Sequence, residues 1–156
     1  MAVVIIMHRR TDTESRLTEL IASRSGLPVK EAEEKDKIEP GTIYVAPADY
    51  HLLIEKDHTF SLDYSEKVHY SRPSIDVSFE AAADAYGDAV AALLLSGAND
   101  DGTSGLEAIK NAGGLALVQD PEAAVVPYMP MMAIKHVEVD RVLRNLEMAS
   151  FLNSLC

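Results

Sequence analysis

Two polar groups stand where they could share acid–base chemistry, each directly after a strand-like apolar run. His8 follows residues 3–7, and the carboxylates Asp100 and Asp101 follow residues 89–95 in an Asp-Gly turn. Open α/β sheets place their ligands just outside the carboxyl ends of parallel strands, so the two groups converge if their strands are neighbours. A histidine held by an aspartate is two thirds of a nucleophile-activating triad, in which the aspartate fixes the tautomer and the histidine acts as the base.

Each half of this pair also has a purely structural interpretation. A single histidine after a strand is more often a loop residue whose hydrogen bonds are satisfied. The pair Asp101-Gly102 can be only a turn, with Thr103 as the N-cap of the next helix. The occurrence of both groups at equivalent strand ends is what favours the catalytic interpretation.

The sequence offers no convincing nucleophile to complete a triad. Cys156 lies in a predicted terminal helix, and Ser74 is expected to cap a helix. Ser96 and Ser104 lie close to the aspartates, but neither sits in a glycine-rich strand-to-helix turn that exposes a hydroxyl. An unrelated α/β hydrolase that uses Ser96 or Ser104 stays open as an alternative.

The other polar candidates have weaker functional interpretations. Arg72 can reach a carboxylate on a substrate or partner, although a structural role explains it as well. The spacing of the remaining histidines fits no metal motif, so we interpret them as surface or packing residues, and we expect no metal and no cofactor. These histidines are His51, His58, His69 and His136.

Alternating strands and helices predict the scaffold that positions these residues. Strands buried on both faces are expected at residues 3–7, 89–95 and 115–118, and a short strand at 29–32. Helices are expected from Thr11 or Asp12 to residue 24 and at 74–86, 103–112, 130–136 and 145–155. Residues 43–62 are expected to form a small antiparallel insertion that contains a hairpin. The predicted fold is α/β, with a doubly wound, mostly parallel, Rossmann-like sheet and a small β-hairpin insertion.

Length and composition limit the class of protein. The 156 residues suit one domain spanning residues 1–156, and 47% hydrophobic with 25% charged residues is typical of a globular chain. A net charge of -11 disfavours nucleic acid and anionic membrane surfaces as partners. No run approaches the ~20 apolar residues that span a bilayer, so we expect no membrane insertion. The single cysteine indicates a reducing compartment, the cytoplasm.

Five short segments of the chain are informative as a set because of their order along the sequence. They are Ile-Tyr-Val-Ala-Pro-Ala-Asp-Tyr-His-Leu at 43–52, His-Tyr-Ser-Arg-Pro-Ser-Ile-Asp-Val at 69–77, Leu-Ser-Gly-Ala-Asn-Asp-Asp-Gly-Thr-Ser-Gly-Leu at 95–106, Gly-Gly-Leu-Ala-Leu-Val-Gln-Asp-Pro-Glu at 113–122 and Met-Pro-Met-Met-Ala-Ile at 129–134. As a set they resemble the catalytic domain of CheB-type chemotaxis protein-glutamate methylesterases over nearly the whole chain. The resemblance implies a doubly wound fold and hydrolysis of glutamate methyl esters on the cytoplasmic helices of chemoreceptors, with methanol released. Some members of that family also deamidate receptor glutamines.

The resemblance further implies a Ser–His–Asp triad. His8 falls at the family's histidine position and Asp101 at its aspartate position. Ala98, Asn99 and Asp100 fall in the loop that lines the site, where the oxyanion contacts are made. Arg72 falls in the same substrate-binding region.

The sequence departs from the family pattern in several places. The family's serine lies in a Gly- and Ser-rich turn after an earlier strand, and this sequence starts at the histidine-bearing strand, so we expect that strand, its turn, the following helix and the serine to be missing. Met7 stands where glutamine is usual, Ala98 and Asn99 replace the usual loop residues, and no receiver domain precedes the catalytic part. We therefore expect an inactive chain with an exposed sheet edge that can drive homo-oligomerisation. The alternative is a catalytically inactive receptor- or partner-binding module of the same fold.

Overall fold

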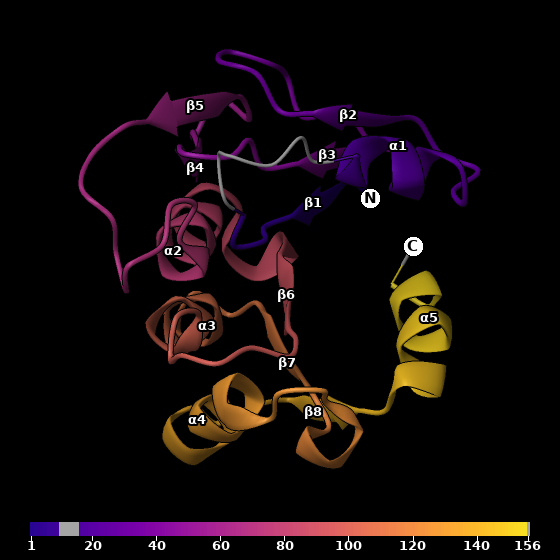
Figure 1. Cartoon of the computed structure of the whole chain (residues 1–156), viewed down its shortest axis with the longest axis vertical. Coiled ribbons are helices and arrows are strands. Elements are labelled where there is room, and N and C mark those ends of the chain that lie inside the picture. The colour runs from indigo at the N-terminus through magenta and orange to yellow at the C-terminus, as the bar shows by residue number, and fades with distance from the viewer. Residues whose placement is uncertain (10–15, 156) are drawn as a thin grey trace.

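Two three-stranded parallel sheets carry the fold in the computed structural model, which describes residues 1–9 and 16–155 (Figure 1). The first sheet has the order β1–β3–β2, with β1 at Val3–Ile5, β3 at Ile43–Val45 and β2 at Val29–Glu31. The second has the order β6–β7–β8, with β6 at Ala91–Leu94, β7 at Leu115–Gln119 and β8 at Arg141–Leu143. A separate antiparallel hairpin joins β4, His51–Ile54, to β5, Phe60–Asp63.

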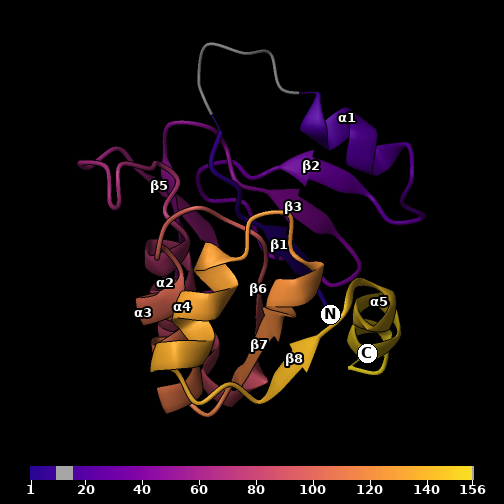
Figure 2. The same ribbon diagram turned by 60° about the horizontal axis from the view of Figure 1, so that its bottom comes forward.

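Helices cover the second sheet on both faces, whereas α1, at Leu17–Ala22, packs beside β2 of the first sheet. The helices around the second sheet are α2 at Ile75–Tyr86, α3 at Thr103–Asn111, α4 at Tyr128–His136 and α5 at Asn145–Asn153, with short 3-10 turns η1 at Gly87–Ala89 and η2 at Pro121–Ala123. Figures 1 and 2 place α2, α3 and α4 on one side of β6–β8 and α5 on the other. This is the doubly wound arrangement that the alternation of elements predicts. Over the part of the chain that the structure describes, no helix has the length and apolar character needed to cross a membrane.

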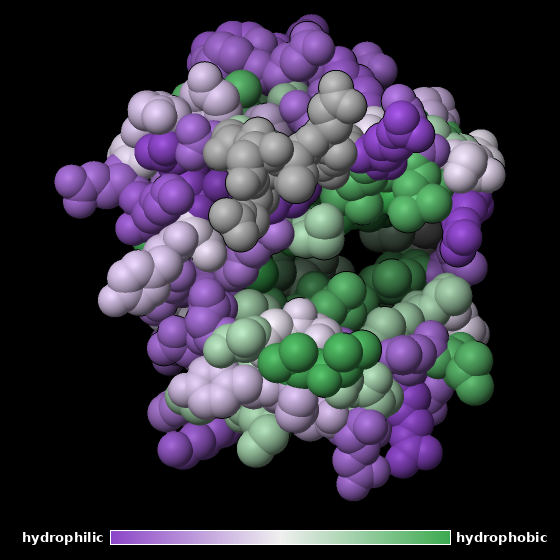
Figure 3. Space-filling model, viewed as in Figure 1, coloured by the Kyte–Doolittle hydropathy of each residue, from purple (hydrophilic) through white to green (hydrophobic). Residues whose placement is uncertain are grey.

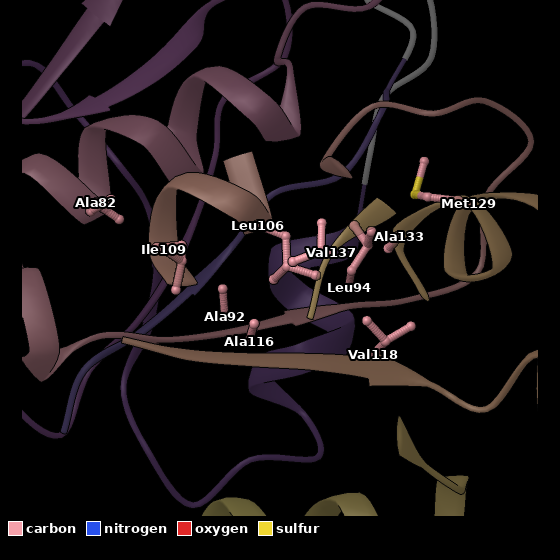
Figure 4. Close-up of a cluster of buried hydrophobic side chains, with 11 residues drawn as sticks. Ala82, Ala92, Leu94, Leu106, Ile109, Ala116, Val118, Met129, Ala133 and Val137 are labelled. Atoms are coloured by element: carbon pink, nitrogen blue, oxygen red, sulfur yellow. The ribbon is translucent and has the colours of Figure 1, made fainter. Parts of the chain in front are cut away.

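The main hydrophobic core lies between the second sheet and the layer of α2, α3 and α4 (Figure 4). Leu94 of β6 and Leu106 and Ile109 of α3 are almost completely buried in it. Small residues let α2 and α3 approach closely: a Cβ on Gly105 would lie 2.6 Å from the Cβ of Phe79 and 2.9 Å from the Cα of Asp76. The close approach matters for the site, because it brings the N-termini of the two helices together.

Most predicted elements are confirmed, and several details of the prediction are wrong. Residues 43–45 do not belong to an antiparallel insertion, since β3 is the central, parallel strand of the first sheet and pairs with both β1 and β2. The true insertion is only the β4–β5 hairpin. Strand β8 was not predicted, because Arg141 and Val142 are exposed and leave no buried alternation to recognise. The predicted helix cap at Thr11 or Asp12 lies outside the described residues.

The edges of β1 and β6 that face each other are unpaired among residues 1–9 and 16–155. There β1 pairs only with β3, and β6 pairs only with β7. The surface drawn in Figure 3, seen from the same side as in Figure 1, is hollowed between the region of β1 and that of β6 and α5. Apolar surface surrounds the hollow. Neither strand is buried on both faces as predicted, because β1 is only half-buried and Ala91 of β6 is exposed.

Candidate active site

His8 and Asp101 are in direct contact. The Nε2 atom of His8 donates a hydrogen bond to Oδ2 of Asp101 across 2.6 Å, from the end of β1 to the turn after β6. The Asp101 side chain is fully buried, whereas 30% of the His8 side chain is exposed. Since an ionised carboxylate only accepts, Nε2 carries a proton, and the lone pair of the neutral imidazole is at Nδ1. The arrangement therefore provides a base on a partly exposed ring whose Nε2 side is held by Asp101.

The Asp101 carboxylate is held by the first turn of α2. Its Oδ2 accepts the N–H of Ile75 at 2.7 Å, and its Oδ1 accepts the Ser74 hydroxyl at 2.8 Å and the N–H of Asp76 at 3.0 Å. Burial by itself raises the pKa of the Asp101 carboxyl, but hydrogen bonds from His8, the two backbone N–H groups and Ser74 outweigh it and bring the pKa below its ordinary value. The carboxylate is thus ionised and fixed against the positive end of a helix.

Ser74 caps α2, as its sequence position predicts, and is itself fixed by a buried histidine. Its hydroxyl oxygen accepts the N–H of Val77 while its proton goes to Asp101. Its backbone N–H donates to Nδ1 of His51 at 3.1 Å, so His51 carries its proton on Nε2, which contacts the carbonyl of Glu66 at 2.9 Å. A continuous hydrogen-bonded path therefore runs from His51 through Ser74 and Asp101 to His8.

Asp76 accepts backbone N–H groups at the start of α3, as Asp101 does at the start of α2. Its Oδ1 accepts the N–H groups of Gly102 at 2.9 Å and Gly105 at 2.7 Å, at the start of α3. Burial raises the pKa of Asp76, and the charge of Asp101 raises it further, against the effect of the two N–H groups and His69. The two helix N-termini thus exchange carboxylates, which locks the turn that carries Asp101 onto α2.

The loop after β6 is tied to His69. The His69 ring lies with Nε2 3.3 Å from Oδ2 of Asp76 and Nδ1 3.2 Å from Oδ1 of Asp100. Asn99 donates through Nδ2 to the His69 carbonyl at 3.4 Å and accepts the N–H of Asp101 at 3.2 Å. Asn99 and Asp100 are therefore next to the pair, as expected, and Ala98 is exposed on the same loop.

The same cluster of side chains also has to be considered as a metal site. Ligand atoms of His69, Asp76 and Asp101 lie within 4.8 Å of one another. The two aspartates, however, already accept five backbone N–H and hydroxyl hydrogen bonds and a bond from His8. Hydrogen bonding within the fold accounts for the cluster, and we assign no metal to it.

The remaining sequence candidates lie in structural contacts. Arg72 donates to Oδ1 of Asp49 and to the carbonyls of Tyr64 and Ser65, and its guanidinium stacks 3.8 Å from the Tyr64 ring centroid. Its role in binding a substrate carboxylate stays a prediction. Ser96 bonds to Val126 through both its hydroxyl proton and oxygen, and Ser104 is exposed on α3. In the described ranges, no serine hydroxyl is hydrogen-bonded to His8.

Sequence reasoning missed three residues that build the site: His51, His69 and Asp76. The two histidines were interpreted as surface or packing residues and Asp76 was given no role of its own, although it stands two residues after the predicted cap Ser74, where an acidic side chain favours a helix start. The partner that makes Asp76 important is the start of α3, about thirty residues further along the chain. No local signal in the sequence reveals such a contact.

Comparison with known proteins gives a consistent result. The family described as CheB methylesterase matches residues 1–152. A relative from Leptospira interrogans, named a protein-glutamate methylesterase/protein-glutamine glutaminase, is 48% identical over 141 residues that cover 90% of this chain and 73% of the relative. A Methanosarcina acetivorans protein of the same name is 36% identical over 150 residues that cover 91% of this chain and 42% of that protein. The crystal structure of the Thermotoga maritima CheB methylesterase catalytic domain superposes with a TM-score of 0.93 at 33% identity, covering 98% of this chain and 82% of that chain.

Proposed function

The chain belongs to the CheB methylesterase family, and we propose that it is a carboxylic ester hydrolase that removes methyl groups from glutamate side chains of chemotaxis receptors. The products are glutamate and methanol, and the second half of the relatives' name suggests glutamine deamidation at the same site. Receptor methylation sites on cytoplasmic helices would place the enzyme in the cytoplasm. The observation that carries the proposal is the 2.6 Å contact between His8 and a buried, ionised Asp101.

In the proposed mechanism, His8 moves the proton and Asp101 keeps the ring in place. A serine hydroxyl attacks the ester carbonyl and gives its proton to Nδ1 of His8, whose imidazolium is stabilised by the Asp101 carboxylate. The same proton passes to the departing methoxide, which leaves as methanol. Water then enters, gives a proton to Nδ1 and hydrolyses the acyl-enzyme, which restores the serine and releases the free carboxylate.

We further propose that the nucleophilic serine is carried by a strand that lies between β1 and β6. The unpaired edges of both strands and the apolar hollow between them support this placement. A strand inserted parallel to both would end beside His8 and Asp101, at the edge of the sheet where ligands bind. A second copy of the chain pairing with the same edges is the competing occupant, and it predicts a stable dimer by sedimentation.

Methanol release from a methyl-esterified chemoreceptor fragment tests the function. Two folded proteins are compared: residues 1–156, and the same residues preceded by an apolar strand and a Gly-Ser-Gly turn. We expect methanol only from the extended protein. Release by residues 1–156 alone would mean that a nucleophile within them completes the site, against this proposal.

A pair of histidine variants in the extended protein tests the role of the base. We expect His8→Ala to lower kcat by roughly 10²–10⁴-fold, the usual contribution of a general base. His136→Ala, at the exposed end of α4, serves as the matched control and should leave kcat unchanged. If His8→Ala leaves methanol release unchanged while the protein still binds the receptor fragment, His8 is not the base. The chain is then a binding module and not an esterase.

A further inference from the structure

We propose that the turn formed by Val68, His69, Tyr70 and Ser71 is a docking element for the polypeptide substrate, with Tyr70 as its contact residue. This inference rests on the proposed function and deepens it. Tyr70 is 97% exposed, an unusual position for a large aromatic residue. Exposure alone does not assign a role, and the argument depends on how the turn is held and on what it adjoins.

The turn holds Tyr70 in a strained and well-defined position. Val68 and Ser71 exchange two backbone hydrogen bonds of 3.2 and 2.8 Å, and both residues between them are left-handed, with φ of 48° for His69 and 62° for Tyr70. Turns with two left-handed central residues normally use Asn and Gly, and bulky residues in this region persist only where their surroundings enforce it. Such strain is more frequent at functional sites than elsewhere.

The surroundings that enforce the turn belong to the candidate active site. The His69 ring lies between Asp76 and Asp100, and the His69 carbonyl accepts the Asn99 side chain. A ring nitrogen of His69 lies within 4.8 Å of an Asp101 carboxylate oxygen. The anchor of the turn is therefore adjacent to the aspartate that holds His8, and the neighbouring residue, Tyr70, points into solvent.

A second exposed apolar residue lies on another segment that is hydrogen-bonded to the same loop. The N–H of Gly97 donates to the carbonyl of Val126 at 3.1 Å, and Ser96 is hydrogen-bonded to Val126 as well. The preceding residue, Val125, is 93% exposed. Tyr70 and Val125 thus stand on two segments that are each hydrogen-bonded to the loop that leads to Asp101.

This geometry fits a polypeptide more closely than a free small ester. A glutamyl methyl ester on a protein brings the backbone that carries it close to His8 and therefore to the neighbouring loop at residues 96–100. In this proposal, the residues on either side of that glutamate contact Tyr70 and Val125. Exposed aromatic residues of this kind often contribute a large share of the binding energy in protein interfaces.

Two substrates separate docking from catalysis in the extended protein, in which the strand and the Gly-Ser-Gly turn precede residues 1–156. We measure kcat and KM on a methylated receptor fragment and on the γ-methyl ester of N-acetylglutamate, together with direct binding of the fragment. We expect Tyr70→Ala to raise Kd and KM for the fragment about tenfold and to leave hydrolysis of the small ester unchanged. Tyr70→Phe should keep near wild-type binding, and His69→Ala, which frees the turn, should weaken direct binding of the fragment as Tyr70→Ala does.

Leu20→Ala is the matched control, because it removes an exposed apolar side chain from α1 and should change neither substrate's kinetics. Fragment binding by Tyr70→Ala equal to that of the wild type would overturn the inference. An equal loss on both substrates would also overturn it, since Tyr70 would then act on the catalytic pair. Absence of hydrolysis of either ester by the wild-type enzyme would refute the proposed function instead, and the binding comparison would still test the turn.

Discussion

Replacement of Ser74 by alanine should destabilise the protein strongly, because this serine makes two contacts at the start of α2. Its hydroxyl donates to the buried Asp101 carboxylate at 2.8 Å, a charge-assisted hydrogen bond worth roughly 1.5–3 kcal/mol. The same oxygen caps the helix by accepting the N–H of Val77, worth about 1 kcal/mol. We therefore expect Ser74→Ala to lower the free energy of unfolding by roughly 2–4 kcal/mol, a large fraction of the stability of a typical domain.

The same helix provides a matched control in Ser78→Ala. Ser78 is also buried, and its hydroxyl donates to the neutral carbonyl of Leu52 at 2.8 Å. Loss of a neutral hydrogen bond costs about 1 kcal/mol, so this variant should be clearly more stable than Ser74→Ala. Urea unfolding followed by circular dichroism at neutral pH measures both variants against the wild type.

The pH dependence identifies the carboxylate as the cause of the difference. The pKa of Asp101 lies below its ordinary value in the folded state, so the stabilisation from the ionised group is present above the unfolded-state pKa. That stabilisation disappears as the pH falls through the lowered pKa of the folded state. The difference in the free energy of unfolding between Ser74→Ala and Ser78→Ala should therefore become smaller as the pH is lowered. Equal costs for the two variants, or a gap that does not change with pH, would refute the assignment of Ser74 as a positioning residue for Asp101.

Two further predictions concern the contact between α2 and α3. Asp76→Asn keeps the oxygen that accepts the N–H groups of Gly102 and Gly105 and removes a buried carboxylate whose pKa is raised by burial. The variant should be more stable than the wild type at neutral pH. The gain should shrink as the pH falls below the raised pKa of the folded state and disappear below the ordinary pKa of the unfolded state, which urea titrations at several pH values detect. Gly105→Ala should cost roughly 1–3 kcal/mol, because its Cβ would lie 2.9 Å from backbone atoms of Asp76. Gly97→Ala should destabilise the protein less, because a Cβ at that position would mainly meet the Cε and Sδ atoms of the flexible Met129 side chain. Thermal melts compare the two glycine variants. An equal loss of stability in both variants would contradict the reasoning.

Local patterns in the sequence were sufficient for most of the elements and indicated one contact. Ser74 before a helix-forming run predicted the start of α2, and the order of strands and polar turns predicted that His8 and Asp101 converge if their strands are neighbours. They meet although β1 and β6 belong to different three-stranded sheets of the described structure. The condition that the two strands are neighbours is not met by hydrogen bonding in the described structure, but the contact between the two side chains spans the separation of their strands.

Residues whose function depends on distant partners escaped prediction. Residues 43–45 read as part of a hairpin region because apolar runs follow closely after them, and only the pairing with β1 and β2 makes them a central parallel strand. His69 read as a surface residue because its two carboxylate partners come from α2 and from the loop after β6. The interpretation of a polar residue thus changes when tertiary contacts supply partners that local spacing does not show.

Asp101 is held in place by more contacts than His8, and the proposed strand between β1 and β6 would reduce this difference. Asp101 is fixed by four donors and by the close packing of α2 on α3. His8 leaves the end of β1, a three-residue strand hydrogen-bonded on one side only in the described structure. A strand inserted beside β1 would hydrogen-bond it on its second edge and cover the apolar hollow. The segment proposed to supply the nucleophile would therefore also fix the position of the base that activates it.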